Sequence, residues 1–401
     1  MKKYILIFCF FYSLFSCAPS QIEMLRGGAI ENAVYRDTVS FNFDYNLPII
    51  TVEIDQVNYN FLLDTGAPSV ISPELFVKLN LKKKLTSKIK DSNNISNSEI
   101  FTQIPQMKIG NLQYTNIGVY VIDLRKSFAL KCLNIDGIIG ANQMAKSYWK
   151  LDYENKWCVI SNDLPKSEIE NYEIVNFTPK NGQLTPLVDI FIDKIKFGNV
   201  VFDTGFNGAI SLPNNKSLDS VFEKKVELYG VESVGIYGLG TTKTFVEALL
   251  PFVKLDSLVL SKQSVTFSDD PSMVIGNEVF KNYSIIFDWN LQKMYFKKNA
   301  NLRSKKTSEF ISFGFGFIKN GDKIEVVKLI KNSEAEKKGL LIGDEVLTIN
   351  DVIFKNIKDN QFCDFFYFGL KEFKLGDIIN VKVLRNNEEL KFTLTKENYF
   401  N

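Results

Sequence analysis

Hydrophobic and polar residues alternate from residue 50 to residue 55, and this period of two is typical of a β-strand. A second apolar strand is expected at residues 59–63. The same order of two apolar segments recurs much later, at residues 186–192 and 199–202. These patterns predict a mainly β fold.

Each pair of predicted strands leads directly into the tripeptide Asp-Thr-Gly, at residues 64–66 and again at 203–205. Two apolar residues and a glycine follow each tripeptide after a similar interval, ending at Gly140 and Gly276. One Asp-Thr-Gly alone is more typical of a turn, but several elements that recur in the same order indicate an internal repeat. The sequence therefore predicts two tandem lobes of similar fold.

The domain boundaries follow from changes in the pattern. We place the first lobe at residues 41–162 and the second at 163–300, and expect residues 17–40 to be a tether with weak structure. Residues 301–309 are polar, basic and unpatterned, as is typical of a linker. A further strand-rich unit is expected at residues 310–398.

Residues 1–16 have the features of an export signal, with Lys2-Lys3 followed by twelve apolar residues. That run is too short for a helix to cross the roughly 30 Å hydrocarbon core of a membrane. Its end, Leu-Phe-Ser-Cys, resembles the lipobox of bacterial lipoproteins, which implies lipid modification of Cys17. The alternative is an ordinary secretory signal. Either way we expect export, and the lipobox implies a lipid anchor on the periplasmic or cell-surface side, with the outer membrane favoured.

Composition narrows the possible chemistry. The chain has 401 residues and no histidine, which excludes Ser-His-Asp and Cys-His nucleophile systems and imidazole metal sites. Its formal net charge of +2 provides no basic field, so we expect no nucleic-acid partner. No cofactor or metal is expected.

The five cysteines form no C-x-x-C pair, so neither a zinc site nor a redox motif is supported. A disulfide framework is not expected in a chain of this size with so few cysteines. Cys132 and Cys158 are a possible pair that the sequence cannot test.

The two aspartates of the repeated tripeptide, Asp64 and Asp203, are the candidate catalytic residues. Hydrolysis of an amide needs a base to activate water and an acid to protonate the leaving nitrogen. Two adjacent carboxylates retain one proton between them and so offer both functions, as aspartic proteases are known to do. Gly66 and Gly205 are expected to permit the tight turn that presents each carboxylate.

The repeated motifs resemble the tandem lobes of a retropepsin-like, pepsin-clan aspartic protease over roughly residues 41–300. The resemblance implies two β-barrel lobes, an Asp64/Asp203 dyad, and a polypeptide substrate. It also implies that Thr65 and Thr204 hydrogen-bond across the lobe interface. Phe206 departs from the family pattern, in which alanine or serine is commoner after the glycine.

A flap that closes over the substrate is expected in the second lobe. Its candidate is the glycine-rich hairpin tip that contains Gly235, Ile236, Tyr237 and Gly238. The corresponding region of the first lobe, residues 91–98, is rich in asparagine and serine and has no glycine, so it favours a second flap less.

The C-terminal unit resembles a bacterial PDZ domain through the string Ala335-x-x-x-Gly-Leu followed by Gly343-Asp-x-Val-x-x-Ile-Asn. Ser333 and Glu336 predict a capped helix start there. The resemblance implies an α+β domain that binds a peptide or protein C-terminus as an added strand. The candidate loop for this is Gly314, Phe315, Gly316 and Phe317.

These features lead to the hypothesis of an exported aspartic endopeptidase with a C-terminal PDZ domain. A catalytically inactive peptide-binding or scaffold lipoprotein with protease-like lobes is the alternative, motivated by Phe206 and the weaker first flap. A serine protease that depends on histidine is excluded by the composition.

Overall fold

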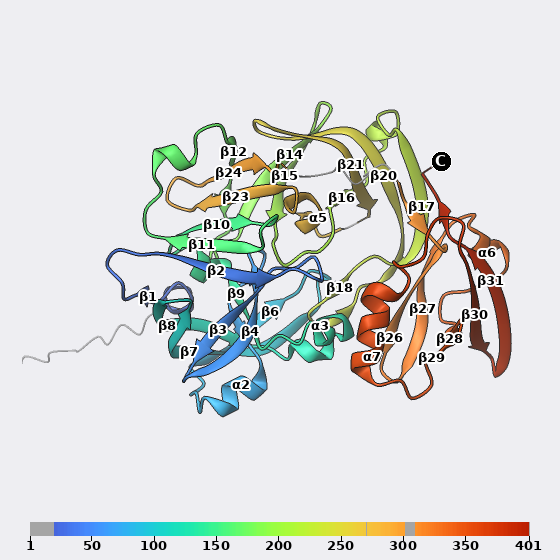
Figure 1. Ribbon diagram of the computed structural model, residues 1–401, viewed down its shortest axis with the longest axis horizontal. Coiled ribbons are helices and arrows are strands. Elements are labelled where there is room, and N and C mark those ends of the chain that lie inside the picture. Colours follow the sequence, from blue (N-terminus) through green and yellow to red (C-terminus); the bar gives the residue numbers. More distant parts are fainter. Residues whose placement is uncertain (1–19, 270, 301–308, 401) are drawn as a thin grey trace, which may run out of the picture.

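The computed structural model describes residues 20–269, 271–300 and 309–400. The protein is built mainly of β-strands, arranged as two lobes and a C-terminal module that lies beside them (Figure 1). The predicted export signal and Cys17 lie outside the described residues, as does the linker from residue 301 to residue 308.

The first lobe is a barrel-like sheet in which some hydrogen-bonded neighbours are not consecutive in the sequence. A pairing between β3 and β7 closes the sheet on itself. In sheet order its strands are β2 (Arg36–Asn42), β3 (Ile49–Ile54), β4 (Val57–Asp64), β9 (Gly137–Gly140), β5 (Val70–Ile71), β8 (Leu112–Val121), β7 (Ser96–Ile109) and β6 (Leu85–Lys90), with β1 (Ala29–Ile30) paired to β8.

The alternating stretch forms β3, as predicted. Ile50, Val52 and Ile54 face the core and are at most 2% exposed. The chain then reverses through Asp55 and Gln56, which both adopt positive φ, and returns as β4. Alternation therefore set the register of this hairpin, because a shift by one residue would expose the apolar side chains.

The second lobe repeats this arrangement, with a pairing between β14 and β20 in place of the one between β3 and β7. Its strands in sheet order are β13 (Thr178–Pro179), β14 (Pro186–Ile192), β15 (Ile195–Phe202), β22 (Val274–Ile275), β16 (Ile210–Pro213), β21 (Leu258–Ser268), β20 (Thr242–Leu255) and β17 (Lys224–Val231), with β18 (Val234–Gly235) and β19 (Gly238–Leu239) forming a separate small hairpin.

A further set of strands joins the two lobes. Matching strands of the two repeats pair here, with Trp149 of β10 opposite Phe287 of β23. Both side chains are fully buried in one hydrophobic core that extends through the two lobes. The strands are β10 (Tyr148–Asp152), β11 (Trp157–Ser161), β12 (Glu173–Asn176), β23 (Tyr283–Asp288) and β24 (Lys293–Lys298).

The C-terminal module continues the sheet of the second lobe, because its β27 pairs with β17. It has its own aromatic core. Its strands are β25 (Ile311–Ser312), β26 (Phe315–Asn320), β27 (Lys323–Ile330), β28 (Glu345–Ile349), β29 (Val352–Ile353), β30 (Ile378–Arg385), β31 (Glu388–Thr395) and β32 (Glu397–Asn398).

The helices are short and lie at the ends of strands. The side chain of Ser333 accepts a hydrogen bond from Glu336 N–H, as predicted, whereas the Glu336 carboxylate binds Asn332 N–H. The α-helices are α1 (Gln21–Leu25), α2 (Pro73–Lys78), α3 (Phe128–Cys132), α4 (Ala141–Met144), α5 (Asn277–Phe280), α6 (Glu334–Lys337) and α7 (Asp359–Asp364); three 3₁₀ turns (Leu124–Lys126, Lys166–Glu168, Lys216–Leu218) and a π-helix (Phe365–Gly369) complete the set. None of the helices in the described ranges is long and apolar enough to span a membrane.

Part of the expected tether is folded. Helix α1 packs on the first lobe through the buried Leu25, whose carbonyl oxygen accepts a hydrogen bond from Asn142 Nδ2. Strand β2 begins at Arg36, five residues before the predicted start of the lobe. The prediction of weak structure was therefore wrong for residues 21–25, 29–30 and 36–40, the last because polar residues on the exposed face of β2 concealed the strand.

The cysteine pairing also differs from the pair considered above. Cys132 is bonded to Cys363 of the C-terminal module, and Cys158 is a free, buried thiol in β11. The two bonded cysteines are 231 residues apart. Sequence reasoning could not find this bond because it depends on how the module docks.

Gly230 provides a test of the junction between β17 and β27. It has φ of 129°, and a Cβ there would lie 2.7 Å from the Lys328 Cα and closer still to the Val327 carbonyl oxygen. We expect Gly230→Ala to destabilise the protein by about 2 kcal/mol or more in urea unfolding.

Gly316→Ala is the matched control, since a Cβ there would meet no atom closer than 3.4 Å. Equal destabilisation by the two substitutions would contradict a tight junction at Gly230.

Candidate active site

The two predicted catalytic aspartates stand at equivalent places in the two lobes. Asp64 ends β4 and pairs in parallel with Gly140 of β9. Asp203 follows β15, and its N–H donates to the Ile275 carbonyl oxygen at 3.0 Å. Each carboxylate is therefore held by an apolar strand and by the apolar-apolar-Gly segment of its own repeat.

The structure brings the two Asp-Thr-Gly loops into direct contact. A Cβ added to Gly66 would lie 2.5 Å from the carboxyl carbon of Asp203, and one added to Gly205 would lie even closer to that of Asp64. Neither glycine has a positive φ. Both glycines lie in a turn, as expected, but the turn does not use a backbone conformation reserved for glycine. Glycine is required because each carboxylate packs on the opposite loop.

The two threonines link the loops by four buried hydrogen bonds. Thr65 N–H donates to Thr204 Oγ1 and Thr204 N–H donates to Thr65 Oγ1, both at 3.0 Å. Each hydroxyl then donates to the strand of the other lobe: Thr65 to the Phe202 carbonyl at 2.6 Å, and Thr204 to the Leu63 carbonyl at 2.9 Å. These reciprocal bonds hold the loops in register.

Burial raises the pKa of both carboxyl groups, most strongly that of Asp64, where the charge of Asp203 adds to the shift. Backbone donors partly oppose it: Gly66 N–H binds Asp64 Oδ1 at 2.8 Å, and Gly205 N–H binds Asp203 Oδ1 at 2.7 Å. The pair therefore retains a proton at a pH where ordinary carboxyl groups have lost theirs. One ionised and one protonated carboxyl group can act together as base and acid.

Phe206 does not displace the dyad. Its ring lies against Gly208, and its carbonyl oxygen accepts the N–H of Asn277 at the start of α5. A side chain at Gly276 would collide with Phe206. The two glycines thus make room for a residue larger than the family pattern has there.

The second-lobe flap candidate is the β18–β19 hairpin, whose tip holds Ile236 and Tyr237. In the first lobe, β6 and β7 also form a hairpin, with its turn at residues 91–95. The two tips touch: Tyr237 N–H donates to Asp91 Oδ2 at 3.2 Å, and Asn93 Nδ2 donates to the Gly238 carbonyl at 3.2 Å. A first-lobe hairpin is therefore present without a glycine, because Asn94 adopts the positive φ of the turn.

The candidate peptide-binding loop of the C-terminal module is more closed than its sequence indicates. Phe315 and Phe317 are buried in the core of the module. Gly314 N–H donates to Ser312 Oγ at 3.1 Å, and φ at Gly314 is 88°. The loop contributes aromatic packing, and it lies apart from the dyad in another unit of the fold.

Sequence reasoning missed two supporting residues. Asn277 Nδ2 donates to the Thr204 carbonyl at 2.6 Å, and its own Oδ1 accepts from Tyr153 at 3.1 Å. Gln183 Nε2 donates to the Gly66 carbonyl from an irregular loop of the second lobe. The repeat does not mark Asn277, because the residue at its place in the first lobe is Ala141, and nothing in the pattern marks Gln183.

Comparison with known proteins supports the protease-like character of this site. Residues 50–143, which include the first Asp-Thr-Gly loop, match a sequence family described as aspartyl protease. No curated protein matches the chain. Among solved structures, Basic 7S globulin from soybean is similar, with 11% identity and a TM-score of 0.42, over 66% of this chain and 95% of that one. The mainly β lobes agree with an aspartyl protease fold.

The threonine bonds can be tested at Thr204. Thr204→Val keeps the shape but leaves the Thr65 N–H and the Leu63 carbonyl without their partner, both in a buried site. We expect a loss of about 2–4 kcal/mol in the free energy of unfolding, measured in urea. Thr204→Ser retains the hydroxyl and should lose only about 1 kcal/mol with its methyl group. Similar losses would show that the hydroxyl has no such role.

The raised pKa values predict a stability that depends on pH. The folded pair holds its protons to a higher pH than the unfolded chain, so stability falls as pH rises above the ordinary carboxyl range. Each unit of pKa difference corresponds to about 1.4 kcal/mol. We expect Asp203→Asn to raise the melting temperature at about pH 7, and this gain to vanish near pH 3, where both carboxyl groups are protonated in either state.

Scanning calorimetry at both pH values measures this difference. Asp193→Asn is the control, because Asp193 lies in an exposed turn of the same lobe. A gain for Asp203→Asn that is the same at both pH values would contradict the assignment.

Proposed function

We propose, from the match of residues 50–143 to the aspartyl protease family, that this chain is an aspartic endopeptidase with Asp64 and Asp203 as its catalytic dyad. The observation that carries this proposal is the contact of the two Asp-Thr-Gly loops, which packs each carboxylate against the other loop. The substrate class is polypeptide.

The reaction uses the one proton that the pair retains. The ionised carboxylate removes a proton from a water molecule, and the oxygen of that water attacks the carbonyl carbon of the peptide bond. The protonated carboxyl group supplies the proton that the leaving nitrogen needs. The two groups then exchange roles, so that one proton again remains on the pair. Because Asp64 and Asp203 are both only partly buried, solvent reaches them.

The hairpin tips around residues 91–95 and 236–237 would act as flaps. Their mutual hydrogen bonds must break before an extended peptide can enter between the lobes, and the peptide then replaces the lost contacts. Two hydrogen bonds between the hairpin tips are weak enough to break when a peptide enters.

Three further proposals rest on resemblance. The C-terminal module is a PDZ domain that binds a peptide or protein C-terminus; its supporting feature is β26, which among the described residues pairs with β27 alone. The chain is exported through residues 1–16. Cys17 carries a lipid anchor that holds the protein at the outer membrane.

The test is cleavage of a diverse peptide mixture by the full-length chain from acid to mildly alkaline pH, read by mass spectrometry. Asp64→Asn and Asp203→Asn should each lower cleavage by at least about a thousandfold, because either loss removes the shared proton or the base. Asp193→Asn, the exposed turn variant, should cleave as the natural chain does.

Cleavage that survives either dyad substitution would overturn the proposal. If no peptide is cut at any pH while peptides still bind, the chain is the inactive peptide-binding protein that Phe206 suggested.

A further inference from the structure

The C-terminal module is attached to both lobes. At the second lobe β27 pairs with β17, with Leu329 opposite Tyr229. Lys328 of the same strand lies over the ring of Phe245 at 5.4 Å. Burial lowers the pKa of this lysine, and the facing charge of Glu247 opposes that shift. This attachment consists of main-chain pairing and the contact of Lys328 with the Phe245 ring.

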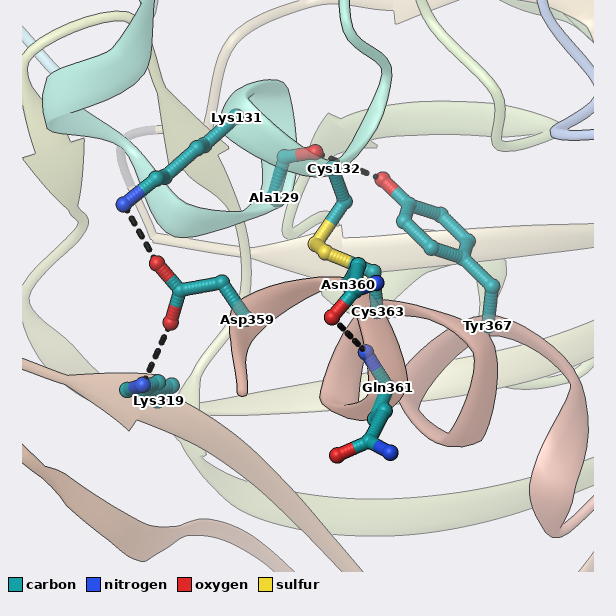
Figure 2. Close-up of a disulfide and its surroundings, with 9 residues drawn as sticks. All are labelled: Ala129, Lys131, Cys132, Lys319, Asp359, Asn360, Gln361, Cys363 and Tyr367. Carbon is teal, nitrogen blue, oxygen red and sulfur yellow. Dashed lines mark hydrogen bonds and ion pairs between the residues drawn. A yellow bond between two sulfur atoms is a disulfide. The ribbon is translucent and has the colours of Figure 1, made fainter. Parts of the chain in front are cut away.

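The second attachment joins the module to the first lobe through helix α3. Cys132 at the end of α3 is bonded to Cys363 in α7. Tyr367 of the π-helix that follows α7 donates its hydroxyl proton to the Ala129 carbonyl at 3.0 Å. Figure 2 shows that Cys363 of α7 and Tyr367 of the following π-helix both point toward α3.

Two ion pairs also contribute to the attachment between α3 and the module. Asp359, the first residue of α7, lies between Lys131 of α3 and Lys319 of β26, with both N···O distances at 2.5 Å (Figure 2). The two ammonium groups lower the pKa of Asp359. One carboxylate therefore ties together three elements: α3 of the first lobe, and the strand and helix of the module that α3 contacts.

Phe128, at the start of α3, inserts among the aromatic residues of the module. Its ring centroid lies 5.2 Å from that of Phe362 and 6.1 Å from that of Phe366. The ammonium group of Lys319 lies 5.8 Å from the same ring. Helix α3 thus contacts both β26 and α7, the strand with an unpaired edge and the helix beside it.

We propose that the C-terminal module is a clasp between the two lobes, in which α3 of the first lobe occupies the β26–α7 face of the module and the Cys132–Cys363 bond fastens it there. While the bond is intact, α3 excludes an added peptide strand from that face and the first lobe cannot move away from the module. The consequence for peptide binding and for opening of the cleft rests on the proposed function; the clasp itself does not.

Opening the clasp requires a dithiol reductant. One thiolate of the dithiol attacks a sulfur of the Cys132–Cys363 bond, which forms a mixed disulfide and releases one cysteine as a thiolate. The second thiol of the reductant then attacks its own sulfur in the mixed disulfide and releases the other cysteine. Two electrons and two protons pass to the protein, leaving two cysteine thiols, and the reductant becomes a cyclic disulfide. The contacts described above that still hold α3 are then non-covalent. They are the packing of the Phe128 ring, the hydrogen bond from the Tyr367 hydroxyl, and the exposed ion pair of Lys131 with Asp359.

Hydrogen–deuterium exchange on the full-length chain tests the clasp without any ligand or activity. In Cys132→Ser/Cys363→Ser we expect exchange in α3 and β26 to become at least about tenfold faster, while β17, β27 and β10 keep the rates of the natural chain. The natural chain, folded first and then treated with dithiothreitol, should show the same change. Cys158→Ser, which removes a buried thiol outside the clasp, should not.

Unchanged protection of α3 and β26 after loss of the bond would overturn the proposal. So would faster exchange in all strands at once, since the bond would then stabilise the whole fold and not one contact. If the chain proves inactive in cleavage but α3 and β26 lose protection as expected, the clasp stands and the protease proposal fails.

Discussion

The close approach of the two Asp-Thr-Gly loops is the constraint on which the site depends. Only a hydrogen atom fits at Gly66 and Gly205, because the carboxyl group of the opposite loop fills the space of a side chain. The same approach brings the threonine hydroxyls within reach of the opposite strands. It also partly buries both carboxyl groups and so raises their pKa values. The geometry of the two loops and the raised pKa values of their carboxyl groups therefore have the same cause, the close approach of the loops.

The rest of the fold keeps these loops together. The strands that join the lobes pair β10 with β23 and share a continuous core, so each lobe is packed on the other. The two hairpin tips also meet, at Asp91 and Tyr237. The C-terminal module adds a third link, by main-chain pairing to one lobe and by a disulfide to the other. Restraints that act from several sides limit the relative movement of the lobes.

Several elements could be predicted because they depend on neighbours in the sequence. The strand at Ile50 to Ile54 follows from a period of two, and the recurrence of four elements in order identified the second lobe. Elements whose stability comes from distant partners were missed. Strand β2 looks polar because one of its faces is exposed, and α1 is held by Asn142, more than a hundred residues away. The turn of the first-lobe hairpin needs no glycine, because Asn94 adopts positive φ there. The absence of glycine was therefore a poor guide to whether this hairpin forms.

The sequence by itself determined the β class, the two-lobe repeat and the two aspartates, since local periodicity and a repeated motif are properties of the chain alone. Only the tertiary structure decided why the glycines are needed, which cysteines pair, and where the C-terminal module sits. Each of these depends on atoms that lie far apart in the chain and come within a few ångströms of one another only when the lobes and the module have packed.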